Sequence, residues 1–259
     1  MRYPSMRHRI RWVAILACSL MGCATNPPLS SQSHKLLQLR IALGVGYMRQ
    51  GQLGLARNEL AQALAMDPTD ASANSAMAIV EERLREPVKA EHFFRVGLAN
   101  HPHDGSLQNN YGAFLCSNGK VQEALAHFKA ALNSPLYPTP QLADLNMGVC
   151  LMKTPDKKAA IHYFHRAQAL APELAGPYYY LARVRYQSHE FQRALANIHQ
   201  YLRLARSAQG LFLGVEIGRA AGDTKFVRYC ATRLLSGFAH TPQARTVEEW
   251  QRKGQLLGH

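Results

Sequence analysis

The chain has 259 residues, of which 47% are hydrophobic, so it can bury a substantial core and is not disordered as a whole. Its 18 glycines and 13 prolines form no long flexible tract, which favours one continuous architecture over two domains on a linker. The formal net charge is +13, but the basic residues are dispersed and no zinc-finger or RNA-recognition pattern occurs, so we predict no nucleic-acid binding.

The first 22 residues are predicted to be an export signal. Four arginines and no acidic residue precede an apolar stretch at 12–22, which is shorter than the roughly 20 residues that span a bilayer. The stretch ends in Leu20-Met21-Gly22-Cys23, which resembles the lipobox of bacterial lipoproteins. This resemblance implies cleavage before Cys23 and lipidation of that cysteine. Ala24 follows instead of Asp, which by the same resemblance implies sorting to the outer membrane.

Two alternatives to this signal remain. A competing lipobox ends at Cys18, but it would leave an apolar core of only the six residues 12–17. An ordinary cleaved signal or an uncleaved anchor is the other alternative. Up to about residue 35 the chain shows no helical or strand periodicity. We therefore expect residues 23–36 to be a lipidated tether between the membrane and the fold.

The chain after the tether repeats with a period of 34 residues. In the first unit, Gly44, Tyr47, Ala56 and Pro68 lie where tetratricopeptide repeats have Gly or Ala, Tyr, Ala and Pro, and the later units keep this register. Two extra residues precede the fourth unit, and the sixth is degenerate because Arg228 stands where a small residue is expected. The predicted segments are 37–70, 71–104, 105–138, 141–174, 175–208 and 209–242, followed by a C-terminal tail or capping segment at 243–259.

This pattern predicts an all-α fold, a right-handed superhelix of about six helix-turn-helix repeats. Small residues at the eighth and twentieth positions of each unit let its two helices approach closely, and bulky residues fill the space between them. A single unit cannot bury its own faces, so neighbouring units must stack to form a curved solenoid. The first helices of the units then line a groove.

Two runs in the middle of the repeats point to a narrower family. Asn109-Asn110-Tyr111-Gly112-Ala113-Phe114-Leu115-Cys116 lies in the third unit, and the fourth carries the similar Leu145-Asn146-Met147-Gly148-Val149-Cys150. With the lipobox, the number of units and the length, the chain resembles the type IV pilus biogenesis and stability lipoproteins of the PilF/PilW family. The resemblance implies a pilotin, which is lipid-anchored in the outer membrane, faces the periplasm, binds the secretin subunit of the pilus system and promotes its localisation and multimerisation.

Other roles for such a scaffold remain open. One is a generic periplasmic scaffold for cell-envelope or peptidoglycan enzymes. Another is an accessory lipoprotein of an outer-membrane assembly machine. We predict no enzymatic activity, cofactor or small-molecule substrate, because no phosphate-binding glycine loop and no nucleophile motif is present.

Apolar side chains recur at the positions that face the groove in tetratricopeptide units. An isolated solenoid would expose them to water, so we expect a helix or strand of a partner protein to cover them. For the first unit the alternative is packing beneath the tether. The predicted partner-binding residues are Ile41, Val45, Met48, Asn109, Leu142, Leu145, Val149, Met152, Tyr179, Arg183 and Tyr186.

Cysteines and titratable pairs complete the candidate sites. Cys116 and Cys150 lie on the first helices of adjacent units, so a disulfide between them is geometrically plausible in an oxidising compartment. The alternative is two buried thiols that pack as small apolar groups. His162 and His165 are one helical turn apart without a third ligand, so we interpret them as a surface pair and predict no metal. The acidic pairs 81–82 and 248–249 are interpreted as solvated helix faces.

Overall fold

The computed structural model describes residues 30–257. The predicted signal, the lipobox, Cys18 and Cys23 fall outside these residues. Within them the regular structure is entirely helical, and none of the helices is long and apolar enough to cross a membrane. The thirteen helices of this part of the chain are α1 (Ser31–Arg49), α2 (Leu53–Met66), α3 (Ala71–Arg83), α4 (Pro87–Asn100), α5 (Gly105–Ser117), α6 (Val121–Leu132), α7 (Pro140–Leu151), α8 (Lys157–Leu170), α9 (Ala175–Gln187), α10 (Phe191–Leu204), α11 (Ala208–Ala221), α12 (Thr224–Gly237) and α13 (Pro242–Arg252).

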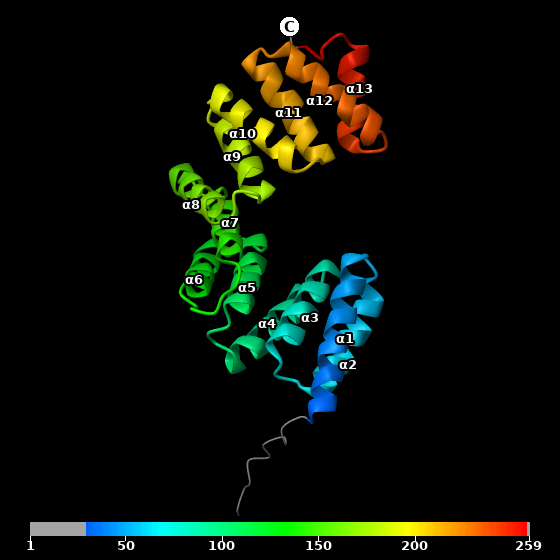
Figure 1. Ribbon diagram of the computed structural model, residues 1–259, viewed down its shortest axis with the longest axis vertical. Helices are drawn as coiled ribbons and strands as arrows, with labels where there is room; N and C mark the ends of the chain where they lie inside the picture. Colours follow the sequence, from blue (N-terminus) through cyan, green and yellow to red (C-terminus); the bar gives the residue numbers. More distant parts are fainter. Residues whose placement is uncertain (1–29, 258–259) are drawn as a thin grey trace, which may run out of the picture.

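The first twelve helices form six antiparallel pairs that follow one another along a curved path. Each odd-numbered helix packs on the next even-numbered one, and each pair also packs on its neighbours in sequence. Figure 1 shows α1 and α2 at one end of the curve and α11, α12 and α13 at the other. The predicted all-α tetratricopeptide superhelix is therefore confirmed.

Glycine at the eighth position permits the close contact within the pairs. A Cβ atom added at Gly112 would lie 2.8 Å from Cε1 of Phe128, and one at Gly148 would lie 2.5 Å from Cε1 of Phe164. Both phenylalanines are fully buried. Each ring thus packs against the backbone of the facing helix, which a side chain on that helix would prevent.

The tether ends earlier than predicted. Helix α1 begins at Ser31, because the side chain of Ser30 accepts a hydrogen bond from the backbone N–H of Ser33 at 3.1 Å and caps the helix. Six residues of helix therefore precede the predicted start of the first unit. Residues 31–36 are largely exposed, and the first buried side chain of α1 is Leu37, which packs with α2 and α3 residues.

The sixth pair is regular in the structure, and its register differs from the one that the sequence predicts. Arg228 is exposed on α12, and the contact with α11 is made by Val227 and Cys230, which are both fully buried. A Cβ atom at Gly214 would lie 2.7 Å from Sγ of Cys230, so this pair has its own close approach. The prediction that placed Arg228 at the small-residue position is therefore wrong.

Helix α13 covers the exposed end of the last pair. Ala244 and Val247 are buried against α11 and α12. The guanidinium of Arg219 lies over the Trp250 ring at 4.4 Å, and the ring of Phe212 stacks on Trp250 at 5.5 Å. The helix begins at Pro242, and it shields apolar surface that a seventh pair would otherwise have to cover.

Candidate functional site

The first three pairs enclose one end of the groove. A cavity of about 320 Å³ lies between α1, α3 and α5. Apolar side chains form much of its wall, and hydroxyl and amide groups lie among them. Such a mixture suits a polypeptide that buries apolar side chains and makes a few hydrogen bonds. The lining residues are Val45, Met48, Ala71, Ser72, Ser75, Ala76, Ile79, Asp104, Ser106, Leu107 and Asn110.

Amide side chains connect the first helices of successive pairs. Asn110 donates a hydrogen bond from Nδ2 to Oγ of Ser75 at 2.9 Å. Asn146 donates from Nδ2 to Oδ1 of Asn109 at 3.0 Å, and Asn109 is 5% exposed. Asn109, predicted as a partner-binding residue, therefore has its acceptor engaged within the protein and offers little surface to a partner.

The predicted groove residues of the first helix differ in what they contact. Val45 is half-buried and lines the cavity. Met48 also lines it but is 8% exposed, because it packs against α2 and α3 residues. Ile41 is 7% exposed and packs with Leu37 and Ala73 instead of lining the cavity, so it belongs to the core. Its prediction as a groove residue is corrected.

In the fourth pair the predicted residues retain accessible surface. Leu142 is 36% exposed, and Leu145, Val149 and Met152 are half-buried. Leu145 lies close to α9, because a Cβ atom added at Gly176 would lie 2.9 Å from its Cδ2. These side chains extend apolar surface from the first cavity towards the second.

Tyrosines form the other end of the groove. A second cavity of about 470 Å³ is lined by Tyr179 and Arg183, and Tyr186 is half-buried one turn further along α9. Burial raises the pKa of the Glu216 carboxyl, whereas the nearby Arg183 lowers it. This end therefore presents aromatic and charged groups, whereas the first cavity combines apolar side chains with small polar ones. The cavity lining is Ala175, Gly176, Tyr179, Tyr180, Arg183, Tyr201, Ala205, Ser207 and Gln209.

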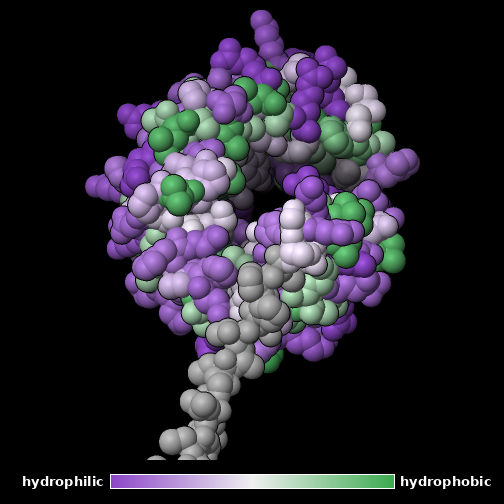
Figure 2. All heavy atoms as spheres, turned by 60° about the horizontal axis from the view of Figure 1, so that its bottom comes forward, coloured by the Kyte–Doolittle hydropathy of each residue, from purple (hydrophilic) through white to green (hydrophobic). Residues whose placement is uncertain are grey.

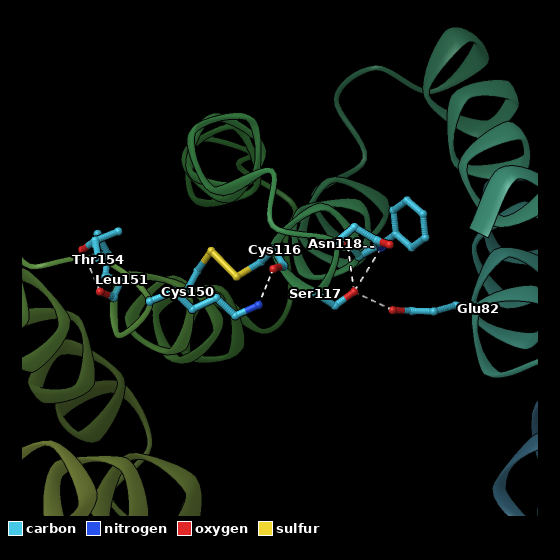
Figure 3. The surroundings of a disulfide bond; sticks show 9 residues. Glu82, Cys116, Ser117, Asn118, Cys150, Leu151 and Thr154 are labelled. Atoms are coloured by element: carbon cyan, nitrogen blue, oxygen red, sulfur yellow. Dashed lines mark hydrogen bonds between the residues drawn. A yellow bond between two sulfur atoms is a disulfide. The ribbon is translucent and has the colours of Figure 1, made fainter. Parts of the chain in front are cut away.

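A disulfide joins Cys116 on α5 to Cys150 on α7, with the two Cα atoms 5.8 Å apart (Figure 3). Hydrogen bonds extend this connection on both sides. Lys153 donates from Nζ to the carbonyl oxygen of Cys116 at 2.5 Å, and Ser117 donates from Oγ to Oε1 of Glu82 at 2.8 Å. Covalent and polar links thus connect the second, third and fourth pairs near one end of their first helices.

The histidine pair and the acidic pair 248–249 are exposed, as the sequence predicts. The acidic pair 81–82 is not fully exposed. His162 and His165 are exposed, and within residues 30–257 no cluster of three metal-ligating side chains occurs. Glu248 and Glu249 are also exposed. Glu81, however, is 1% exposed, so its interpretation as a solvated residue is wrong.

Three cavity-lining residues that the sequence analysis does not predict stand at informative positions of the repeat. Ser75 and Ile79 line the first cavity at positions five and nine of the second unit, which belong to the groove-facing set. Glu81 stands at the eleventh position, where the first unit has Tyr47 and the third has Leu115. A polar residue at an otherwise apolar position of a repeat was a detectable signal of a special environment.

The groove is open to solvent. In Figure 2 the molecule is hollowed at its centre, and hydrophobic patches around the opening are interrupted by hydrophilic ones. The first cavity lies between α1, α3 and α5, and the second lies between α9, α10 and the start of α11. The candidate functional site is therefore an extended protein-binding surface and not a compact catalytic pocket.

Comparison with known proteins identifies the repeats and their relatives. The tetratricopeptide repeat family matches residues 41–105 and 115–175. Type IV pilus assembly protein PilF of Pseudomonas aeruginosa is 28% identical over 228 residues, which cover 84% of this chain and 89% of PilF. The tetratricopeptide family is a scaffold family and not an enzyme family.

Two solved structures share the arrangement of helices. The crystal structure of PilW, described as a widely conserved type IV pilus biogenesis factor, is 29% identical, with a TM-score of 0.75 over 85% of this chain and all of that one. The structure of Pseudomonas aeruginosa PilF is 24% identical, with a TM-score of 0.70 over 86% of this chain and 99% of that one, and supports the fold. The chain is a tetratricopeptide-repeat protein of the PilF/PilW-like kind, homologous to PilF over most of its length.

Proposed function

We propose that this protein acts in type IV pilus biogenesis as a pilotin. In this role it binds the secretin subunit, accompanies it to the outer membrane and promotes its multimerisation. The observation that carries the proposal is the homology to PilF and PilW, which extends over about 85% of the chain and therefore includes the whole groove. The cavity between α1, α3 and α5 provides a surface of apolar and polar groups on which a segment of the secretin can dock.

We further propose that the protein is lipidated at Cys23 and faces the periplasm from the outer membrane. The lipobox-like sequence supports this proposal. Several acyl chains on one cysteine anchor a protein stably, whereas a single chain binds only marginally. Cys23→Ala should release the protein from the membrane fraction, and retention of this variant in outer membranes would refute lipidation at this residue.

Deletion of the gene tests the pilus role. The expected result is loss of heat-stable secretin multimers and of surface pili, with normal cell shape and normal amounts of other outer-membrane proteins. Altered cell shape would favour a scaffold for peptidoglycan enzymes. A general loss of outer-membrane proteins would favour a role in an outer-membrane assembly machine.

Substitutions in the groove test the docking surface. Val45→Asp introduces a charge into the wall of the first cavity, and we expect it to abolish co-purification with the secretin. Leu170→Asp is the matched control, because Leu170 is 54% exposed at the end of α8 and lines neither groove cavity. Both variants should keep the helical circular-dichroism spectrum. Equal secretin binding by the two variants would refute docking in the first cavity.

A further inference from the structure

A third cavity lies on the other side of α3 from the first groove cavity. It has a volume of about 520 Å³ and is enclosed by α2, α3 and α4. This volume is within the range of about 300–1,000 Å³ found for ligand pockets. Its lining shares no residue with the two groove cavities and consists of Arg57, Ala61, Met77, Glu81, Val88, Lys89, His92 and Phe93.

The repeat pattern accounts for this cavity. Glu81 stands at the eleventh position of its unit, which is Tyr47 in the first unit and Leu115 in the third. Leu115 is fully buried and fills its site with apolar atoms. In the second unit the Glu81 side chain ends in a carboxylate and does not fill the equivalent site with apolar atoms. The side chains of Met77 and Phe93 therefore border a cavity. Val88 adds apolar surface that is 82% exposed at the edge.

The Glu81 carboxylate within this wall is only half satisfied. Its side chain is 2% exposed, and Oε1 forms an ion pair with Nε of Arg57 at 2.8 Å. Oε2 is buried and has no hydrogen-bond partner among residues 30–257. A buried acceptor without a donor is destabilising, so this oxygen marks a place where a donor would bind favourably.

The charges around the cavity favour a neutral hydrogen-bond donor for Oε2 of Glu81. Arg57 already neutralises Glu81, so a second cation would add uncompensated charge to a buried site, whereas a neutral hydroxyl would not. The rim carries Lys89 and His92, which favour acidic neighbours of the inserted group. Oε2 is buried in the unliganded chain, so a donor reaches it only if a neighbouring side chain moves, and the 47% exposed side chain of Arg57 is the one placed to do so.

We propose that this cavity is a docking site for a tyrosine side chain from an acidic segment of a partner protein. The ring occupies the apolar volume, and the phenolic hydroxyl donates a hydrogen bond to Oε2 of Glu81. The inserted ring restores the aromatic group that Tyr47 provides in the first unit. The site is separate from the groove and independent of the proposed pilotin role.

The proposal can be tested with p-cresol as a probe for the tyrosine side chain and toluene as the matched ligand without the hydroxyl. The full chain carrying ¹³C-methyl methionine is titrated while the Met77 signal is followed by NMR. We expect saturable binding of p-cresol with a shift of the Met77 methyl resonance. Toluene should bind at least about tenfold more weakly, because it cannot donate the hydrogen bond.

Two variants assign the binding to this cavity. Glu81→Leu introduces the residue that fills the equivalent position in the third unit, so it should fold and lose p-cresol binding. Glu82→Gln is the control, because Glu82 lies next in sequence but does not line the cavity, and binding should be unchanged. Lack of saturable binding to the unaltered chain, or unchanged binding to Glu81→Leu, would overturn the proposal. Equal affinity for toluene would overturn the assigned hydrogen bond.

Discussion

Gln108 donates a hydrogen bond from Nε2 to the carbonyl oxygen of Pro102, six residues earlier, at 2.7 Å. The same position and spacing recur in other pairs. Asn74 donates from Nδ2 to the carbonyl of Pro68 at 2.9 Å, and Tyr178 donates from its hydroxyl to the carbonyl of Pro172 at 3.2 Å. The fourth residue of a unit thus ties the first helix of a pair to the loop that precedes it.

In the fourth pair this position is occupied by Asp144, whose ionised carboxylate cannot donate. Asp144 is fully buried, neither of its carboxylate oxygens has a hydrogen-bond partner among residues 30–257, and Nε of Arg166 lies 3.5 Å from Oδ2. Asp144→Asn replaces the carboxylate by an amide, which can donate a hydrogen bond as Asn74 does in the second pair. We expect an increase in unfolding free energy of about 1 kcal/mol at neutral pH, measured by urea denaturation. A loss of stability would show that the ion pair with Arg166 stabilises the fold by more than burial of the carboxylate costs.

The same residue predicts a pH dependence of stability. Burial raises the pKa of Asp144, while Arg166 and then His162 oppose this shift. Because the pKa is higher in the folded than in the unfolded chain, the folded state binds the proton more tightly, and stability from this group falls as pH rises through the folded-state pKa. The advantage of Asp144→Asn should therefore shrink in acid below that pKa. A pH-independent difference between the two proteins would contradict this prediction.

The disulfide between Cys116 and Cys150 should contribute substantially to stability. It closes a loop with a sequence separation of 34 residues, for which the chain-entropy model gives roughly 3 to 4 kcal/mol. Reduction, or a Cys116→Ser/Cys150→Ser double variant, should lower the unfolding free energy by about that amount. Equal stability of the oxidised and reduced proteins would contradict this prediction.

Thiol labelling in denaturant provides a separate check on the disulfide. Without reductant, Cys230 should be the labelled cysteine within residues 30–257, since it is the free cysteine there. With reductant, labels should also appear on Cys116 and Cys150. In the native protein Cys230 should react slowly, because burial raises its pKa to about 12.

Gly148→Ala should destabilise the fourth pair. The new Cβ would lie 2.5 Å from Cε1 and 2.7 Å from Cδ1 of Phe164, which is fully buried and has little room to move. Overpacking of this kind costs about 1–3 kcal/mol. Gly46→Ala is the control, because a Cβ there meets nothing within 4 Å and alanine favours a helix. A neutral Gly148→Ala variant would indicate that the two helices can separate without loss of packing.

Two turns between paired helices should be improved by glycine. Gly51 and Gly119 adopt φ angles of 76° and 81°, which glycine accepts without steric cost, but the equivalent residues Arg85 and His189 adopt 64° and 59°. A left-handed conformation costs other residues about 1–2 kcal/mol. Arg85→Gly and His189→Gly should each remove this steric cost, which raises the unfolding free energy by about 1 kcal/mol. The backbone entropy that glycine loses on folding reduces this gain. Thermal unfolding would check this, and a lower midpoint for both variants would contradict it.

The repeat architecture follows from the spacing of residue types along the chain. The period of 34 and the small residues at fixed positions leave one way to bury the apolar faces, which is stacking of closely packed pairs, and Gly112 against Phe128 shows this directly. The resemblance to the PilF/PilW family was also visible in the sequence and is confirmed by comparison. These features depend on local spacing, which a linear sequence records.

Which side chains remain available to a partner depends on contacts that form only in the folded chain. Position in a repeat predicted Ile41 as a groove residue, but the contacts of α1 with α2 and α3 bury it, and the hydrogen bond from Asn146 engages Asn109. Burial of Glu81 and Asp144 was likewise not predicted, because it depends on how neighbouring pairs close over one helix. Exposure and hydrogen bonding are set by contacts between units, which the pattern within a unit does not contain.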